Sequence, residues 1–247
     1  MSATFKFKQF TVKQDRCAMK IGTDGVLLGA WTPLPENVNR ILDIGAGTGI
    51  VALQMAQRTY AETIDAVEID EDAYEQCSEN FENSPWADRL FCYHAAAQEF
   101  ASYFLDTEED EEESEEKYDL IVSNPPFYSE DYKTASKARD HARFNDALPF
   151  EHLIGCVHAL LDETGFFSII LPRKEEEAFI ALASEAALFA NKICRVRGTI
   201  NSEEKRSMIL FSFRSAETVI ENLTIEISRH EYTEDYKKLV KDFYLKL

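Results

Sequence analysis

The chain has 247 residues, 45% of them hydrophobic, and a formal net charge of −19 at pH 7. This length and hydrophobic content predict one large α/β domain and exclude wholesale disorder, and no apolar run approaches the ~20 residues that a membrane-spanning helix needs. The five cysteines form no Cys-x-x-Cys pair, which argues against a disulfide framework or a zinc site and favours free thiols in a reducing cytoplasm.

The N-terminal part of the chain, residues 1–39, is expected to be an arm that leads into the domain. Its first 14 residues carry three lysines but no apolar run, so they predict no signal peptide. Together with the composition, this favours a cytoplasmic protein without bound metal, folded as a single domain over residues 1–247. Residues 216–247 are then a C-terminal tail, with a short strand from Leu223 and a helix around 235–244.

Short apolar runs alternate with helical patterns along most of the chain, which is typical of a parallel sheet covered on both faces. Two later runs, 193–200 and 207–213, have no helical pattern between them and predict an antiparallel pair at one edge. The expected fold class is α/β, a Rossmann-like, mostly parallel seven-stranded sheet ending in an antiparallel hairpin. The other expected strands are Arg40–Ile44, Thr63–Ile69, Leu90–Tyr93, Tyr118–Ser123 and Phe166–Leu171, and the expected helices are Thr48–Arg58, Asp72–Phe81, Phe150–Leu161 and Lys174–Leu188.

Residues 106–117 form an acidic run with nine carboxylates and one lysine. Its net charge of −8 leaves −11 for the other 235 residues of the −19 total. Such a composition predicts a solvated loop insertion, and surface filler without a function explains it as well as any specific role. The overall acidity would ordinarily count against a nucleic-acid partner.

A Gly-rich turn follows the first expected strand, in the order Asp43-Ile-Gly45-Ala-Gly47-Thr-Gly49. Glycines permit tight turns and let backbone approach a ligand at a helix N-terminus, but the spacing is not the Gly-x-Gly-x-x-Gly of pyrophosphate binding. Asp43 would repel phosphates, and Glu68, at the end of the second expected strand, can accept both hydroxyls of a ribose. The set favours S-adenosylmethionine, whose sulfonium is positive, over NAD; loop capping by both carboxylates is the alternative.

The segment Asn124-Pro125-Pro126-Phe127 follows the fourth expected strand directly. The prolines restrict the backbone, so Asn124 is held at the strand end, where open α/β sheets bind ligands. The Asn124 side-chain oxygen and the Pro125 carbonyl can accept hydrogen bonds from both N–H groups of a planar amine and turn its lone pair toward a methyl donor. Phe127 offers a face for stacking a base. A simple Asn-Pro turn is the alternative.

These motifs, with the upstream Met19-Lys-Ile-Gly-Thr-Asp-Gly-Val-Leu-Leu-Gly-Ala-Trp31 and with Ala138-Arg-Asp-His-Ala-Arg143, resemble one group of class I S-adenosylmethionine-dependent methyltransferases. The group is the bacterial valine-tRNA adenine-N6-methyltransferase family, which methylates the adenosine beside the anticodon. The resemblance implies a tRNA partner. The cofactor residues that the resemblance and the motifs together imply are Lys20, Thr23, Asp24, Asp43, Gly45, Gly47, Glu68 and Asn124, and the catalytic residues are Asn124, Pro125 and Phe127.

The sequence departs from the family at Ala96, where a carboxylate beside the cofactor's adenine amine is expected; Gln98 is the candidate substitute. Beyond Phe127, a long loop carries four cations that are expected to contact RNA, and long loops beside a site often carry function. Arg173, Lys174, Lys205 and Arg206 are expected to extend one basic face; ordinary surface charge is the alternative for each of these cations. The expected RNA-contacting residues are Phe127, Lys133, Lys137, Arg139 and Arg143.

Three alternatives remain open from the sequence. Other Asn-Pro-Pro-aromatic enzymes methylate guanine N2 of rRNA or glutamine N5 of proteins, although the glutamine enzymes carry an N-terminal helical domain for which about 40 residues are too few. A nucleotide-binding oxidoreductase and a module that binds nucleotides without methylating are the others. We expect a monomeric enzyme that methylates tRNA.

Overall fold

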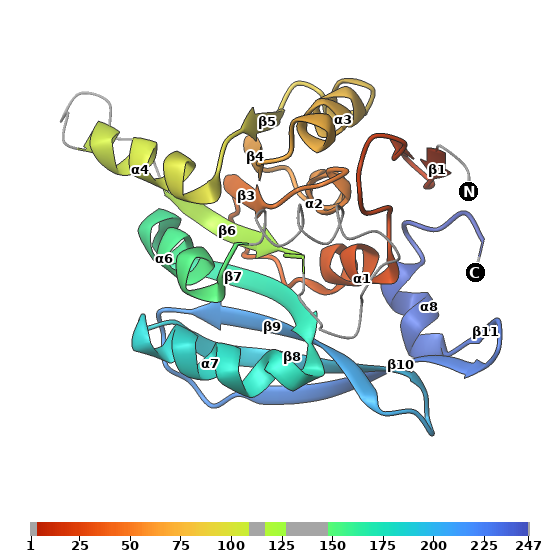
Figure 1. The fold of residues 1–247 in the computed structure, drawn as a ribbon. Coiled ribbons are helices and arrows are strands. Elements are labelled where there is room, and N and C mark those ends of the chain that lie inside the picture. Colours follow the sequence, from red (N-terminus) through yellow and green to blue (C-terminus); the bar gives the residue numbers. More distant parts are fainter. Residues whose placement is uncertain (1–3, 109–116, 127–147, 247) are drawn as a thin grey trace, which may run out of the picture.

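The structure is a computed structural model that describes residues 4–108, 117–126 and 148–246. These residues form one nine-stranded sheet with helices on both faces, and a separate two-stranded hairpin near the N-terminus (Figure 1). The strand order is β11-β10-β8-β9-β7-β6-β3-β4-β5. In this order the strands are Glu231–Tyr232, Val219–Ser228, Phe189–Thr199, Glu204–Ser212, Leu161–Pro172, Tyr118–Ser123, Arg40–Ile44, Thr63–Glu68 and Leu90–His94.

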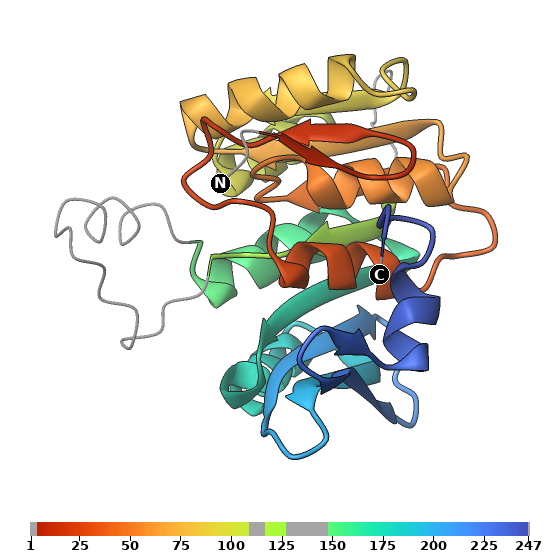
Figure 2. The same cartoon turned by 90° about the vertical axis from the view of Figure 1, so that its right-hand side faces the viewer.

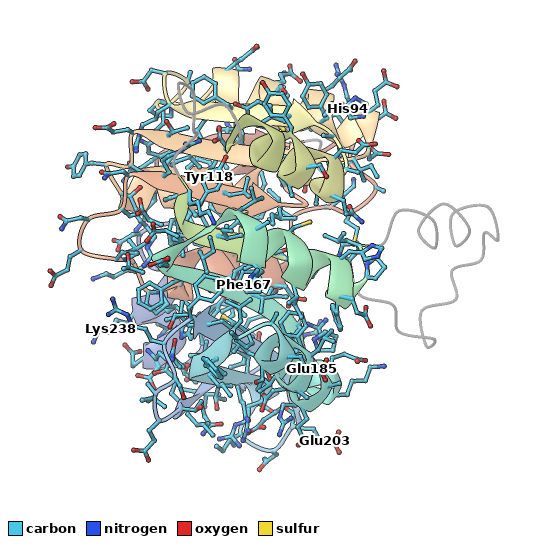
Figure 3. The ribbon with its side chains drawn as sticks, turned by 90° about the vertical axis from the view of Figure 1, so that its left-hand side faces the viewer. His94, Tyr118, Phe167, Glu185, Glu203 and Lys238 are labelled. Atoms are coloured by element: carbon cyan, nitrogen blue, oxygen red, sulfur yellow. The ribbon has the colours of Figure 1, made fainter. Side chains whose placement is uncertain are left out.

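Two hydrophobic clusters lie on opposite faces of the sheet. Successive strand residues point to opposite faces, and Leu120 and Val122 of β6 accordingly join one cluster while Ile121 joins the other. Helices α1, α2, α3 and α8 cover the first face, and α4, α6 and α7 cover the second; Figure 3 looks onto the second face, where Tyr118 and Phe167 are buried. The helices are α1 Thr23–Trp31, α2 Ile50–Arg58, α3 Glu71–Glu82, α4 Ala97–Glu108, α6 Phe150–Leu160, α7 Glu176–Glu185 and α8 Glu234–Val240, with a 3₁₀ turn η1 at Arg173–Glu175.

The Rossmann-like α/β class predicted from the sequence is confirmed, but the predicted arrangement of the last strands is wrong. The antiparallel pair β8–β9 lies inside the sheet, because β10 pairs in parallel with the free side of β8, from Val219 opposite Lys192 to Glu226 opposite Thr199. Strand β11 then adds to β10. The described sheet therefore has nine strands instead of seven, and the predicted tail supplies the two extra ones.

Two helices were not predicted. Helix α1 has no polar face, since every residue from Gly25 to Trp31 is buried, and a helix that is buried all round shows no amphipathic period. Helix α4 extends to Glu108, so residues 106–108 of the predicted acidic loop are helical; residues 109–116 lie outside the described part of the chain.

The N-terminal arm folds back onto the domain as the hairpin β1–β2 (Thr4–Lys6 and Thr11–Lys13). Lys13 exchanges backbone hydrogen bonds with the Asn80 side chain on α3, at 2.8 and 2.9 Å. Phe7 pairs with Tyr244, so the two ends of the chain lie on the same side of the molecule (Figure 2). Within the described ranges, no helix is both long and apolar enough to cross a membrane.

Candidate active site

The Gly-rich turn and Asn124 lie at the carboxyl edge of two neighbouring parallel strands, β3 and β6. The Ser123 hydroxyl, fully buried, donates to the Ile44 carbonyl at 2.8 Å. Each partner of this bond is the last residue of its strand: Gly45 follows Ile44, and Asn124 follows Ser123. Gly45 and Asn124, 79 residues apart, therefore each directly follow a residue that takes part in this hydrogen bond. They lie at the edge where open α/β sheets bind ligands.

The glycines of the turn serve two purposes. Gly45, Gly47 and Gly49 have φ of 76°, 55° and 76°, which disfavours other residues. A Cβ on Gly49 would lie 2.5 Å from the Phe81 ring and 2.8 Å from Cys77 Sγ, so this glycine lets α3 approach. No described atom lies within 4 Å of where a Cβ would stand on Gly45 or Gly47. The backbone of the turn is therefore open at Gly45 and Gly47.

Glu68 connects the end of β4 to this turn. Its two carboxylate oxygens accept from Gly47 N at 2.7 Å and from Asp70 N at 3.0 Å. Burial raises the pKa of Glu68, although the hydrogen bonds from Asp70 and Gly47 oppose the rise. A carboxylate has about four acceptor sites, so a ribose hydroxyl can bind while the backbone bonds stay intact. This arrangement fits the predicted role of Glu68.

Asp43 supports the turn from behind. Its side chain is 1% exposed, and one carboxylate oxygen accepts from Ala52 N at 3.0 Å, in the first turn of α2. Burial raises the pKa of Asp43 to about 7; the Ala52 hydrogen bond lowers it, and the charge of Glu68 raises it further. The carboxylate thus ties β3 to the start of α2.

The raised pKa of Asp43 predicts a pH-dependent stability. An unfolded Asp ionises near pH 4, so between about pH 4 and about pH 7 the folded state binds more protons, and the free energy of unfolding falls as pH rises. The raised pKa of Glu68 acts with the same sign. Asp43→Asn should make urea-unfolding free energies less dependent on pH, by about 1–3 kcal/mol between pH 5 and pH 8. Asp72→Asn, on the exposed side of α3, is the control; equal slopes in both variants would contradict this reading.

The upstream segment lies against Asn124. Lys20 and Thr23 are exposed just before and at the start of α1, while Gly25 is buried. A Cβ on Gly25 would stand 3.6 Å from Asn124 Nδ2 and 3.1 Å from Ile50 Cγ2. A Cβ here would be tight against Ile50 and in ordinary contact with Asn124, so the first turn of α1 lies directly against both residues. The carboxylate of Asp24, predicted to bind the cofactor, is engaged by Arg206 Nε at 2.7 Å.

The edge beyond β4 contains residues that the sequence did not single out. Ile69 follows Glu68 and is 47% exposed, and the His94 ring stacks on Tyr74 with centroids 5.2 Å apart.

Gln98, the candidate substitute for a missing carboxylate, donates to His152 Nδ1 at 2.8 Å. The Glu99 carboxylate instead accepts from Ala96 N at 3.3 Å. A carboxylate therefore does lie beside Ala96, brought back by the first turn of α4.

Three of the four cations predicted to form a basic face, Arg173, Lys174 and Arg206, are paired with carboxylates. Pro172, the residue before Arg173, lies opposite Arg206 in the β7–β9 pair, so these cations share the carboxyl edge. Arg173 Nε lies 3.5 Å from Glu176 and 3.4 Å from Glu204, and Lys174 Nζ lies 3.9 Å from Glu175.

Pro125 is buried and Pro126 exposed. The remaining predicted residues, Phe127, Lys133, Lys137, Arg139 and Arg143, lie outside the described ranges.

Comparison with known proteins agrees with this geometry. Residues 26–143 match the family described as methyltransferase small domain. The chain is 60% identical to the tRNA1(Val) (adenine(37)-N6)-methyltransferase of Christiangramia forsetii, covering 98% of both chains. It is 40% identical to the protein of the same description from Pseudoalteromonas translucida, covering 98% of this chain and 99% of that one. A solved structure described as a predicted O-methyltransferase from Agrobacterium tumefaciens shares the fold, with a TM-score of 0.66 at 18% identity over 89% of this chain and 96% of that one.

Proposed function

The chain belongs to the tRNA1(Val) (adenine(37)-N6)-methyltransferase family, and from this premise we propose that it transfers a methyl group from S-adenosylmethionine to the N6 amine of an adenosine in tRNA. The adenosine is the one beside the anticodon of valine tRNA, as the description of the relatives indicates. The observation that carries the proposal is the hydrogen bond between Ser123 and Ile44, which sets the acceptor segment beside the Gly-rich turn.

The residues at the edge divide into two groups by the substrate they serve. Glu68 would hold the ribose of the cofactor, and Gly45 and Gly47, braced by Asp43, would leave room for it. Lys20 and Thr23 would close over its methionine end. S-adenosylmethionine supplies a methyl group on a positive sulfonium, which needs a nucleophile and no metal-bound water.

The acceptor residues have to expose the lone pair of an amine that is conjugated to a ring. We propose that the Asn124 side-chain oxygen and the Pro125 carbonyl each accept a hydrogen bond from one N–H group of the adenine N6 amine, so that its lone pair turns toward the methyl group. Phe127 would stack on the base. The proton leaves after the methyl has moved, so no side chain with a pKa tuned for a general base is required.

The RNA contacts are proposed on the sequence alone. Lys133, Lys137, Arg139 and Arg143 would bind phosphates in the neighbourhood of the target base, offsetting locally an acidic surface, since exposed charges act over only ~8 Å at physiological salt. We also propose that residues 1–247 act as one methyltransferase domain and as a monomer, because both halves of the site come from one chain. A cytoplasmic location is proposed too; the cysteines are free, as expected in a reducing compartment.

The function is tested by labelling. The protein and S-adenosylmethionine with a labelled methyl group are incubated with bulk tRNA, 16S and 23S rRNA, and release factor from a strain that lacks the modification. Label is expected in tRNA, and nucleoside digestion should identify it as N6-methyladenosine. Label in rRNA or release factor with none in tRNA would favour one of the alternative acceptors, and no transfer to any acceptor would favour a non-methylating module.

A further inference from the structure

An ion pair joins the start of α1 to the C-terminal half of the sheet. Arg206 Nε donates to Asp24 Oδ2 at 2.7 Å across 182 residues of sequence, and the two side chains are 34% and 29% exposed. Arg206 lies near the start of β9, opposite Pro172 of β7 and Val196 of β8. The pair thus spans from the first turn of a helix to the carboxyl edge of the sheet.

That first turn is the part of α1 that touches the acceptor segment. Gly25, the next residue after Asp24, faces the Asn124 amide at 3.6 Å and Ile50 of α2 at 3.1 Å, measured from the position of a Cβ. Its packing is tight against Ile50, and it is in contact range of Asn124. A displacement of this turn would change the space beside Asn124 directly.

From Val26 onward, α1 is attached by other bonds. The Thr32 hydroxyl lies 2.9 Å from the Ser168 hydroxyl, Gln54 donates to the Val26 carbonyl at 3.1 Å, and Arg58 donates to the Gly29 carbonyl at 2.6 Å. At the start of the helix, Gly22 at the N-cap provides no side-chain bond, and the residue before it, Ile21, donates its N–H to the Gln14 side chain at 2.9 Å. Asp24 also favours the helix start through the helix dipole.

We propose that Arg206 is a positioning residue for methyl transfer. Through Asp24 it holds the first turn of α1 against Asn124, and it thereby fixes residues 20–24, which would close over the cofactor, relative to the residue that would hold the target amine. The proposal rests on the proposed function, from which the roles of Asn124 and of residues 20–24 come. It assigns Asp24 a bond to the protein instead of a bond to the cofactor. It also makes Arg206 part of the methyl-transfer geometry instead of an RNA contact.

The test compares Arg206→Gln, Asp24→Asn and the double variant. Each single change should lower kcat for tRNA methylation about tenfold, since small misplacements of reacting groups are costly. The double variant should be no slower than the slower single variant, because both changes break one interaction. The dissociation constant of S-adenosylmethionine, measured by calorimetry, should rise by the same factor in both singles, and that of tRNA should stay within about twofold.

Two controls separate positioning from general destabilisation. Lys192→Gln breaks the Lys192–Glu221 pair, 3.1 Å long and 33% and 40% exposed, near the other end of the same helix; its kcat should match the wild type. Arg206→Lys keeps the cation and should recover at least half of the lost activity. Melting temperatures of all variants show whether each one is folded.

Other outcomes would overturn the proposal. Weaker tRNA binding in Arg206→Gln with normal behaviour of Asp24→Asn would mean that Arg206 binds RNA phosphate. Loss of S-adenosylmethionine binding in Asp24→Asn alone would mean that Asp24 binds the cofactor. Additive losses in the double variant would mean that the two side chains act separately. If the wild type fails to methylate tRNA, the proposed function fails, and the cofactor dissociation constants still decide whether the two side chains act together.

Discussion

Asn124→Ala is expected to lower kcat for tRNA methylation about 10²–10³-fold while the dissociation constant of S-adenosylmethionine stays within about threefold. The alanine removes the side-chain oxygen that accepts an N–H bond of the target amine. The lone pair is then no longer turned toward the methyl group, although the Gly-rich turn and Glu68 remain in place. Single-turnover kinetics with saturating tRNA and calorimetry with the cofactor measure the two quantities.

A matched variant controls for the loss of an asparagine side chain. Asn39→Ala makes the same change at an exposed residue just before β3, at the opposite edge of the sheet, where the described bonds use the backbone: Asn39 N donates to Asp119 at 2.7 Å, and the Asn39 carbonyl accepts from Thr63 N at 3.1 Å. It should leave kcat unchanged. If Asn124→Ala instead lost cofactor affinity and kept its turnover at saturation, Asn124 would be a cofactor residue and not the acceptor residue.

Glu68→Gln is expected to have the largest effect on cofactor binding. Glutamine keeps one acceptor oxygen but replaces the other with an NH₂ group, which cannot accept from a ribose hydroxyl or from the backbone N–H of Gly47 or Asp70, now bound at 2.7 and 3.0 Å. Hydrogen bonds to a charged group contribute about 1.5–3 kcal/mol each. The dissociation constant of S-adenosylmethionine should therefore rise roughly 10- to 100-fold.

The expected kinetic pattern of Glu68→Gln is the reverse of that of Asn124→Ala. The KM for S-adenosylmethionine should rise while kcat at saturation changes by less than about threefold, because the ribose contact is present before and during transfer. Glu71→Gln, an exposed carboxylate in the first turn of α3, is the matched control. Unchanged cofactor affinity in Glu68→Gln would show that this carboxylate only holds the loop.

The parts of the site that the sequence predicted are those encoded by neighbouring residues. Asp43 and the glycines sit within one turn, and Asn124 is followed directly by two prolines, so chemistry and backbone restriction are both visible locally. The strands that carry them are buried on both faces and appear as continuous apolar runs. Their shared edge followed from the rule that parallel strands end on the same side.

The missed features depend on contacts between distant residues. Helix α1 is covered on all sides by the sheet, α2 and α8, so its residues carry no polar stripe. The position of β10 beside β8 depends on which strand side is open, which no local pattern specifies. The pair of Asp24 and Arg206 spans 182 residues, so no local pattern in the sequence predicts it.

The central claim is that Asn124 presents an adenosine beside the anticodon of valine tRNA for methylation at N6. The most direct measurement is mass spectrometry of nucleosides from a valine-tRNA transcript treated with the protein and S-adenosylmethionine, next to a transcript with guanosine in place of that adenosine. We expect N6-methyladenosine in the first transcript and none in the second. Equal methylation of both transcripts, or a methylated guanosine in either, would contradict it.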